Sequence, residues 1–178
     1  SMGVGLTMLR EGDGDAFVSA GSTGALLTGA TLITKRIHGI RRAAMAPVIP
    51  TTSGQAVLIA CGANPECTPD YLMQFAYLGS FYAQQVLGLA KPRVGLLNIG
   101  AEEEKGDALR HETFALLREA GEQGRINFVG NVEANDAVLG KVDVVVADGF
   151  TGNVMLKTLE GTAKFLMKEL KNVYLTNG

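Results

Sequence analysis

The sequence predicts an α/β fold, a three-layer α/β/α sandwich built around a mostly parallel sheet. Strand-like and helix-like segments alternate along the chain, and the strand-like segments, such as "QAVLIAC" and "DVVVAD", are continuous apolar runs. Continuous apolar strands are typical of a parallel sheet that helices cover on both faces. The 23 glycines of the chain suit the short turns that such a fold needs.

The first third of the chain is expected to hold two helices and two strands. Residues 2–10 have a helical apolar pattern that "EGDGD" ends, and residues 16–20, "AFVSA", have the composition of a short buried strand. A helix is expected over 24–37, after the glycine corner "SAGSTGA". Residues 43–51 are expected to be extended, and residues 55–61 to form a buried strand.

A long helix over residues 69–89 follows, with Pro69 near its first position and Gly88 near its C-cap. We expect most of this helix to pack against the sheet; the alternative is a surface that touches a membrane or a second subunit. The remaining elements, in order, are a strand over 93–100, a charged loop and amphipathic helix over 102–121, a strand and turn over 126–133, a strand ending in a glycine corner over 143–153, and a helix over 153–175.

Composition excludes several classes of protein. The 178 residues suffice for one α/β domain, and no apolar run approaches the ~18 residues of a membrane-spanning helix. A net charge of −2 argues against a sequence-independent nucleic-acid binder. Cys61 and Cys67 lack a second Cys or His pair, so no metal site is expected, and reduced thiols fit a cytoplasmic protein.

Four strand ends carry glycines together with small polar residues, in "SAGSTGA", "ACGAN", "NIGAEEEKG" and "ADGFTGN". Ligands of open α/β sheets bind at the carboxyl ends of the strands. Glycines let backbone amides approach a ligand, and helix N-termini favour anions. These corners therefore predict an anion site, although neither the P-loop nor the dinucleotide fingerprint is present.

Two residues at these corners allow both a structural and a functional interpretation. Lys105 could belong to a solvated cap before a helix, or its ammonium could turn back to the strand ends and bind an oxyanion. Asn153 could be the N-cap of the last helix, or its amide could donate a hydrogen bond to a reacting carbonyl. Neither His38 nor His111 is expected to be catalytic, since both fall among charged residues of predicted helices.

Five segments in this order closely resemble the bacterial phosphate acyltransferases of phospholipid synthesis, the PlsX family. They are "DAFVSAGSTGALL", "GANPECTPDYLMQFAYLGSFYA", "PRVGLLNIGAEEEKG", "INFVGNVEANDA" and "DVVVADGFTGNVMLKTLEG". The resemblance spans nearly the whole chain, and it implies a fold shared with phosphotransacetylases and isocitrate-dehydrogenase-like proteins. Members of the family have further segments before and after this region, so we expect residues 1–178 to be one domain from the centre of a longer chain.

The resemblance implies an activity and a set of partners. The family transfers a fatty acyl group from acyl-acyl carrier protein to inorganic phosphate, without a metal or organic cofactor. Its acyl phosphate product feeds a membrane acyltransferase in phospholipid synthesis. Family members are homodimers in the cytoplasm that associate peripherally with the membrane.

The resemblance also implies site residues. Lys105 and Asn153 match positions with catalytic roles in the family. The residues expected to bind phosphate or the other substrate are Gly21, Ser22, Thr23, Gly24, Asn64, Gly149, Thr151 and Gly152. Three positions depart from the family pattern, with Ser22 in place of Asn, Ala43 in place of Pro, and Ala60 in place of Asp.

In the mechanism that we expect, positioning and charge stabilisation supply most of the rate, because phosphate is already anionic and a thiol leaves readily. Backbone amides of residues 21–24 and the Lys105 ammonium would hold phosphate, and Asn153 would stabilise the oxyanion; the roles of Lys105 and Asn153 could be exchanged. Two alternatives stay open. One is a phosphotransacetylase-like enzyme that uses acyl-coenzyme A, and the other is a catalytically dead ligand-binding module, which the loss of a carboxylate at Ala60 favours.

Overall fold

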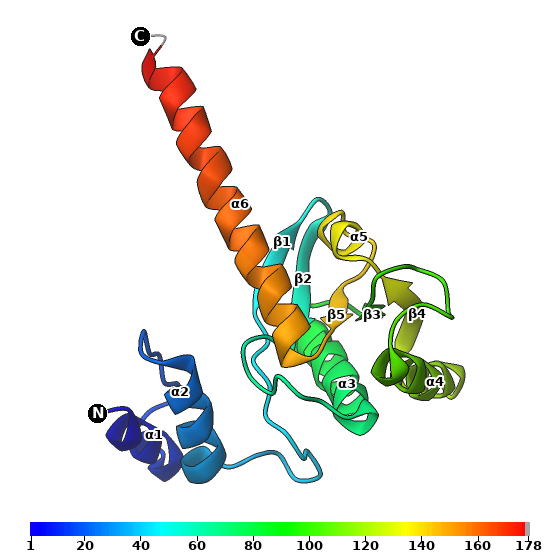
Figure 1. The fold of residues 1–178 in the computed structure, drawn as a ribbon. Helices are drawn as coiled ribbons and strands as arrows, with labels where there is room; N and C mark the ends of the chain where they lie inside the picture. Colours follow the sequence, from blue (N-terminus) through cyan, green and yellow to red (C-terminus); the bar gives the residue numbers. More distant parts are fainter. Residues whose placement is uncertain (177–178) are drawn as a thin grey trace.

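A computed structural model describes residues 1–176 of the chain as a mixed α/β protein (Figure 1). The N-terminal elements are α1 (Met2–Glu11), α2 (Thr23–Gly29) and a π-helical turn (Ala30–Thr34) that continues α2. The elements that follow are β1 (Val48–Thr51), β2 (Gly54–Ile59), α3 (Pro69–Gln85), β3 (Arg93–Leu97), α4 (Ala108–Glu122), β4 (Asn127–Val132), α5 (Ala134–Val138), β5 (Val144–Val146) and α6 (Gly149–Thr176).

The described strands form one five-stranded sheet in the order β1-β2-β5-β3-β4. Strands β2, β5, β3 and β4 run parallel, and β1 pairs with β2 in the antiparallel direction at one edge. The short strand β5 lies in the middle, and all three of its valines are buried. The mostly parallel sheet predicted from the continuous apolar runs is confirmed.

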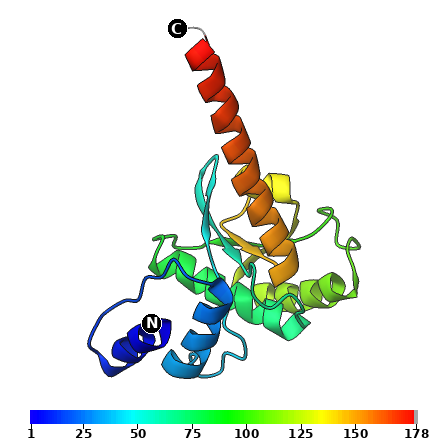
Figure 2. The ribbon, with the colours of Figure 1, turned by 60° about the vertical axis from the view of Figure 1, so that its left-hand side comes forward.

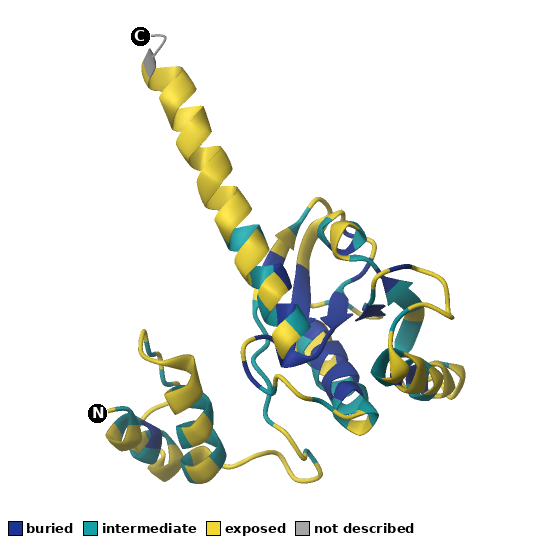
Figure 3. Cartoon of the chain, viewed as in Figure 1, coloured by how far each residue is buried: buried dark blue, intermediate teal, exposed yellow. Residues whose placement is uncertain are grey.

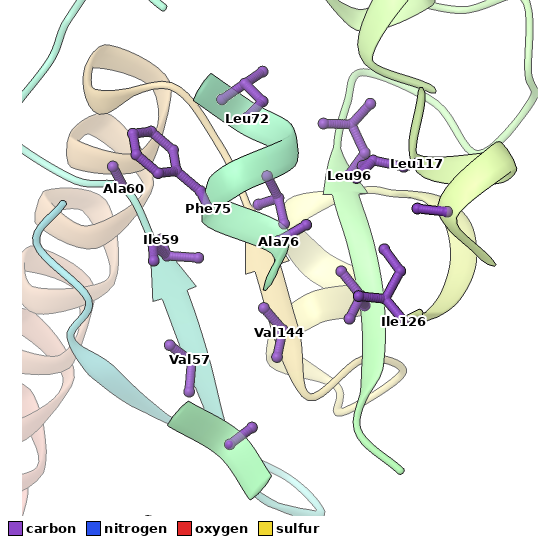
Figure 4. Packing of buried hydrophobic residues seen from close by; sticks show 14 residues of the cluster. Val57, Ile59, Ala60, Leu72, Phe75, Ala76, Leu96, Leu117, Ile126 and Val144 are labelled. Carbon is purple, nitrogen blue, oxygen red and sulfur yellow. The ribbon is translucent and has the colours of Figure 1, made fainter. Parts of the chain in front are cut away.

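Side chains of the buried strands alternate between two cores, one on each face of the sheet. Val57 and Ile59 of β2 point into the core beneath α3 and α4, where Phe75 and Leu117 are also buried (Figure 4). Leu58, from between them, points into the opposite core, which contains residues of α5 and α6. Helices thus cover both faces, as the three-layer prediction requires.

Helix α3 packs in the core, as expected for most of its length. Pro69 occupies the first turn, where its missing N–H costs nothing, and Asp70 adds a favourable negative charge there. The buried face repeats at helical spacing, and it comprises Leu72, Phe75, Ala76, Gly79, Ser80 and Ala83. The helix ends at Gln85, four residues before the expected boundary at residue 89.

The strand predicted over residues 16–20 is wrong. This segment belongs to no strand of the described chain, and the side chain of Val18 is 93% exposed. It connects α1 to α2, and these two helices lie to one side of the sheet (Figures 1 and 2). An apolar run becomes a strand only where a neighbouring strand accepts its backbone hydrogen bonds, and none is within reach here.

Several boundaries also differ from prediction. The helix expected to reach residue 37 ends with the π-helical turn at Thr34, and β3 ends at Leu97 rather than residue 100. Helix α5 was not predicted, because five residues are too few to show a helical period. Helix α6 begins at Gly149, before the expected start at residue 153.

The second half of α6 projects away from the α/β body (Figure 3). Its residues from Gly161 to Leu175 are all exposed. Large apolar side chains on this part of the helix are Phe165, Leu166, Met167, Leu170, Val173, Tyr174 and Leu175. Among the described residues, no helix is long and apolar enough to cross a membrane.

Candidate functional site

The carboxyl ends of β2, β5 and β3 meet at one edge of the sheet, because the three strands are parallel neighbours. The corner "ACGAN" follows β2, "ADGFTGN" follows β5, and "NIGAEEEKG" follows β3. The fourth corner, "SAGSTGA", precedes α2 without following a strand. The site is therefore built on three strand ends, with the start of α2 beside them.

A buried carboxylate organises the middle strand end. Asp148 follows β5, and its Oδ1 accepts hydrogen bonds from the backbone N–H groups of Phe150 (3.0 Å) and Thr151 (2.8 Å). Its Oδ2 accepts from the Thr151 hydroxyl at 2.7 Å and from the Arg110 guanidinium. The same guanidinium donates to Thr151 Oγ1 (3.0 Å) and to Asp107 Oδ2 (3.0 Å). The network ties α4 to the first turn of α6.

The environment keeps Asp148 ionised. Burial alone would raise the pKa of this carboxyl group, since only 5% of the residue is exposed. Hydrogen bonds from Thr151 and the charge and hydrogen bond of Arg110 outweigh burial, so the pKa lies below its ordinary value. Asp148 is therefore a carboxylate that caps the N-terminus of α6.

Of the two roles predicted for Asn153, the structural one, as N-cap of the last helix, is wrong. Because α6 begins at Gly149, Asn153 lies inside the helix and Asp148 takes the capping position. The Asn153 side chain instead approaches the corner after β2, where a Cβ added to Gly62 would lie 3.3 Å from its Oδ1. The amide thus lies beside the strand ends, where it lines a cavity.

Gly149 and Gly152 allow the first turn of α6 to lie against the corner after β2. A Cβ on Gly149 would overlap the Ala63 carbonyl oxygen, and a Cβ on Gly152 would overlap that of Ala60. The backbone N–H of Gly62 donates to the Gly149 carbonyl at 2.9 Å. The two glycines thereby fix where the first turn of α6 sits.

Replacing Gly152 by alanine is expected to destabilise the protein by about 1–3 kcal/mol, because the added methyl group displaces backbone rather than a flexible side chain. Urea unfolding followed by circular dichroism measures this loss. Gly161→Ala is the matched control on the same helix. A Cβ there meets nothing within 4 Å, so no loss is expected. Equal stability of the two variants would contradict the role given to Gly152.

Two cavities flank the first turn of α6. The larger has a volume of about 1010 Å³ and lies between α5, α6 and the loop after β3. The smaller, of about 420 Å³, lies between the start of α2, the end of β2 and α6. Thr151 lines the larger cavity and Asn153 the smaller. The smaller cavity is lined by Thr23, Met45, Ala46, Pro47, Cys61, Gly62, Asn153, Leu156 and Lys157.

Lys105 lies on the exposed loop between β3 and α4. The Asn98 side-chain amide donates to the Lys105 carbonyl at 2.9 Å and so draws this loop back toward the end of β3. The Lys105 side chain passes over Gly100, where an added Cβ would lie 2.9 Å from its Cγ. Lys105 lines neither cavity, although its neighbour Gly106 lines the larger one.

The glycine corner before α2 is exposed, and the structure brings one of its residues to the site. Thr23 shares the smaller cavity with Asn153. Ser22 is the N-cap of α2 without a side-chain capping bond, and the Gly21 N–H donates to Ser19 Oγ at 3.1 Å. Gly24, in the first turn of α2, is exposed and lines neither cavity.

Asn64 lies apart from both cavities. Its side-chain amide donates to the Ala43 carbonyl at 2.7 Å, and it faces a third cavity of about 240 Å³ beside α2. Its own carbonyl accepts from the Gly149 N–H at 3.0 Å. The contacts of Asn64 therefore hold together the backbone on which the site is built.

Three residues at the site were missed from the sequence. Arg110 and Asp148 are 38 residues apart, so no spacing rule connects them. Lys157 lines the smaller cavity one turn further along α6 than Asn153, with its ammonium 2.8 Å from the Glu160 carboxylate. A signal was available for Asp148, since Asp directly before a helical segment is a preferred N-cap residue.

The cysteines are unsuited to act as thiolates. Burial raises the pKa of both Cys61 and Cys67, so both are protonated near neutral pH. Within residues 1–176, no group of three or more His, Cys, Asp or Glu side chains is arranged to hold a metal ion. The polar groups at the strand ends that remain to act on a ligand are amides, hydroxyls and the two lysines.

A known protein family matches nearly the whole chain. The family described as "fatty acid synthesis protein" matches residues 1–176. The chain belongs to this family. It is 51% identical over 167 residues to the phosphate acyltransferase of Clostridium acetobutylicum, covering 94% of this chain and 49% of that protein. It is 51% identical over 173 residues to that of Streptococcus uberis, covering 97% and 51%. The resemblance to PlsX enzymes is thereby confirmed.

The chain spans about half the length of these relatives. Among solved structures, EutD phosphotransacetylase from Staphylococcus aureus is similar with a TM-score of 0.70 at 20% identity, over 92% of this chain and 56% of that one. A phosphotransacetylase from Streptococcus pyogenes gives a TM-score of 0.70 at 18% identity, over 91% and 55%. At this identity the likeness concerns the fold, and it confirms the expected phosphotransacetylase-like architecture.

Proposed function

We propose that the longer protein containing this chain transfers a fatty acyl group from acyl carrier protein to inorganic phosphate. The observation that carries this proposal is the 51% identity, over 94% and 97% of the chain, to two proteins named phosphate acyltransferase. In the reaction, a phosphate oxygen attacks the thioester carbonyl carbon, a C–O bond forms and the C–S bond breaks. The thiolate of the carrier then takes a proton.

The first turn of α6 is the place we assign to the reacting carbonyl. The Asn153 amide, in the smaller cavity, would donate to the oxyanion. Lys157 lines the same cavity, and its ammonium is paired with Glu160 at 2.8 Å. Thr23 borders the same space. Phosphate would bind there, at the start of α2, with backbone amides of residues 21–24 as donors and with the Lys105 ammonium reaching it from the loop after β3. Thr151 donates both its N–H and its hydroxyl proton to Asp148, so we assign it the role of holding the Arg110–Asp148 network beside the substrate.

We also propose the assembly expected from the resemblance, which is a cytoplasmic homodimer that touches the membrane peripherally and passes acyl phosphate to a membrane acyltransferase. The exposed apolar side chains on the projecting half of α6 support a contact that covers them. We further propose that residues 1–178 form a single domain within the longer chain, since the relatives are about twice as long.

The purified full-length protein tests the reaction directly. With phosphate and palmitoyl-acyl carrier protein, it is expected to release free carrier thiol and to form acyl phosphate, detectable as a hydroxamate. Omitting phosphate should abolish both. Release of thiol without acyl phosphate would indicate hydrolysis and contradict the proposal.

The same assay separates the two alternatives. Turnover with palmitoyl-coenzyme A but not with the carrier protein would favour the phosphotransacetylase-like enzyme, which the structural neighbours support only through the fold. Phosphate-dependent thermal stabilisation without turnover of either donor would favour a ligand-binding module. Ala60, which is fully buried where the family has Asp, is the feature that motivates this second comparison.

A further inference from the structure

The proposed reaction does not by itself say what binds in the cavity of about 1010 Å³ beside α6. It reaches the upper end of the range of volumes typical of small-molecule sites, about 300–1,000 Å³. Three other cavities in the described part of the chain are smaller, with volumes of about 440, 420 and 240 Å³. Most of its wall is apolar, made by Leu97, Ile99, Val138, Leu139, Val154, Met155 and Leu159.

One end of this cavity lies at the first turn of α6, where Thr151 and Arg110 contribute to its wall. From there it extends along the helix past Met155 to Thr158 and Leu159. Seven residues of α-helix span about 10 Å, so the cavity extends over roughly that length of α6. Val138 at the end of α5 and Leu139, the C-cap that follows it, form the opposite wall.

The cavity has no excess positive charge. Arg110 is the only Lys or Arg among the described residues that line it. Its guanidinium pairs with two carboxylates, Asp107 and Asp148, so the three groups together carry a net charge of −1. An anionic headgroup would meet no unpaired cation here, whereas a neutral apolar chain ending in a thioester carbonyl can meet the N–H groups of Arg110 at one end only.

We propose that this cavity binds the fatty acyl chain of the donor, with the thioester carbonyl at the first turn of α6 and the methyl end toward Thr158 and Leu139. The proposal rests on the proposed function and names its acyl subsite. It also gives the two cavities complementary roles, since Thr151 and Asn153 lie on the same turn and line different ones. The acyl chain enters the larger cavity and phosphate occupies the smaller.

Narrowing the far end of the cavity tests the proposal in the full-length protein. Thr158 is exposed, so Thr158→Phe places a larger side chain in the cavity without disturbing the core. Thr162→Phe is the matched control, the same change one turn further along α6, outside the lining. Leu139→Phe narrows the cavity from the α5 side and serves as the second variant. For each, kcat/KM is measured with hexanoyl and palmitoyl donors.

Each methylene group of the acyl chain that can no longer be buried lowers the binding constant about fourfold. Excluding two or three of them should lower the palmitoyl-to-hexanoyl ratio of kcat/KM by about 15- to 60-fold in Thr158→Phe and Leu139→Phe. The ratio of Thr162→Phe should equal that of the wild type. If both cavity variants keep the wild-type ratio while the wild type makes acyl phosphate, the acyl assignment is overturned and the proposed function stands. If the wild type makes none, the proposed function itself fails.

Discussion

Replacing Asp148 by alanine is expected to lower the free energy of unfolding by about 3–5 kcal/mol, the cost of removing one partner of a buried ion pair. The Arg110 side chain is only 12% exposed, and without Asp148 its remaining carboxylate partner is Asp107. The change also leaves the N–H groups of Phe150 and Thr151 without their cap. Chemical denaturation at pH 7, followed by circular dichroism, measures the loss.

Two control variants show where this loss of stability comes from. Asp70→Ala removes an exposed ion pair with Arg41 and should cost no more than about 1 kcal/mol. Asp148→Asn keeps a good capping residue but removes the charge, so it should be less destabilising than Asp148→Ala. A loss below about 1 kcal/mol for Asp148→Ala would show that the network does not hold α6 to α4.

The same carboxylate gives a dependence on pH. Its pKa is lower in the folded protein than in the unfolded chain, so the folded state binds fewer protons there. The stability it contributes is fully present above the unfolded pKa of about 3.9 and is lost as the pH falls through the folded pKa. The difference in stability between the wild type and Asp148→Asn should therefore shrink below about pH 4. A difference that stays constant from pH 7 to pH 3 would exclude this origin.

The parallel sheet could be predicted because burial on both faces leaves a local signature. "DVVVAD" is apolar at each position of β5, and β5 lies between two strands under helices on both sides. "AFVSA" is also a mainly apolar segment, yet Val18 is exposed. The difference is whether a neighbouring strand is present, and that depends on residues far away in the chain.

The candidate site, like the sheet, could be predicted from the sequence only in part. Glycine corners at strand ends identify the edge of the sheet where ligands bind, and Asn153 and Thr23 do share a cavity there. The partners of Asp148 could not be predicted, because Arg110 comes from a different helix. Neither could the large apolar cavity, whose walls come from α5, α6 and a loop. Local sequence patterns indicate which edge is used, and long-range packing decides the shape of the site.

Replacing Lys105 by alanine in the full-length protein is expected to lower kcat/KM for acyl phosphate formation by about 10²–10³, as the loss of one charge-stabilising donor typically does. The basis is its position on the loop that Asn98 draws back to the end of β3. Steady-state assays over a range of phosphate concentrations show whether the loss falls on the KM for phosphate, as expected for a residue that holds phosphate, or on kcat, as expected if Lys105 and Asn153 exchange roles.

The stability of the Lys105→Ala protein should be unchanged, because the side chain is exposed and no ion pair within residues 1–176 engages its ammonium. Lys91→Ala is the matched control. It removes an exposed lysine at the opposite, amino end of the same strand β3 and should leave the rate unaltered. Lys105→Arg keeps the charge and should recover part of the activity. Activity of Lys105→Ala within about threefold of the wild type, well short of the expected range, would remove Lys105 from the reaction.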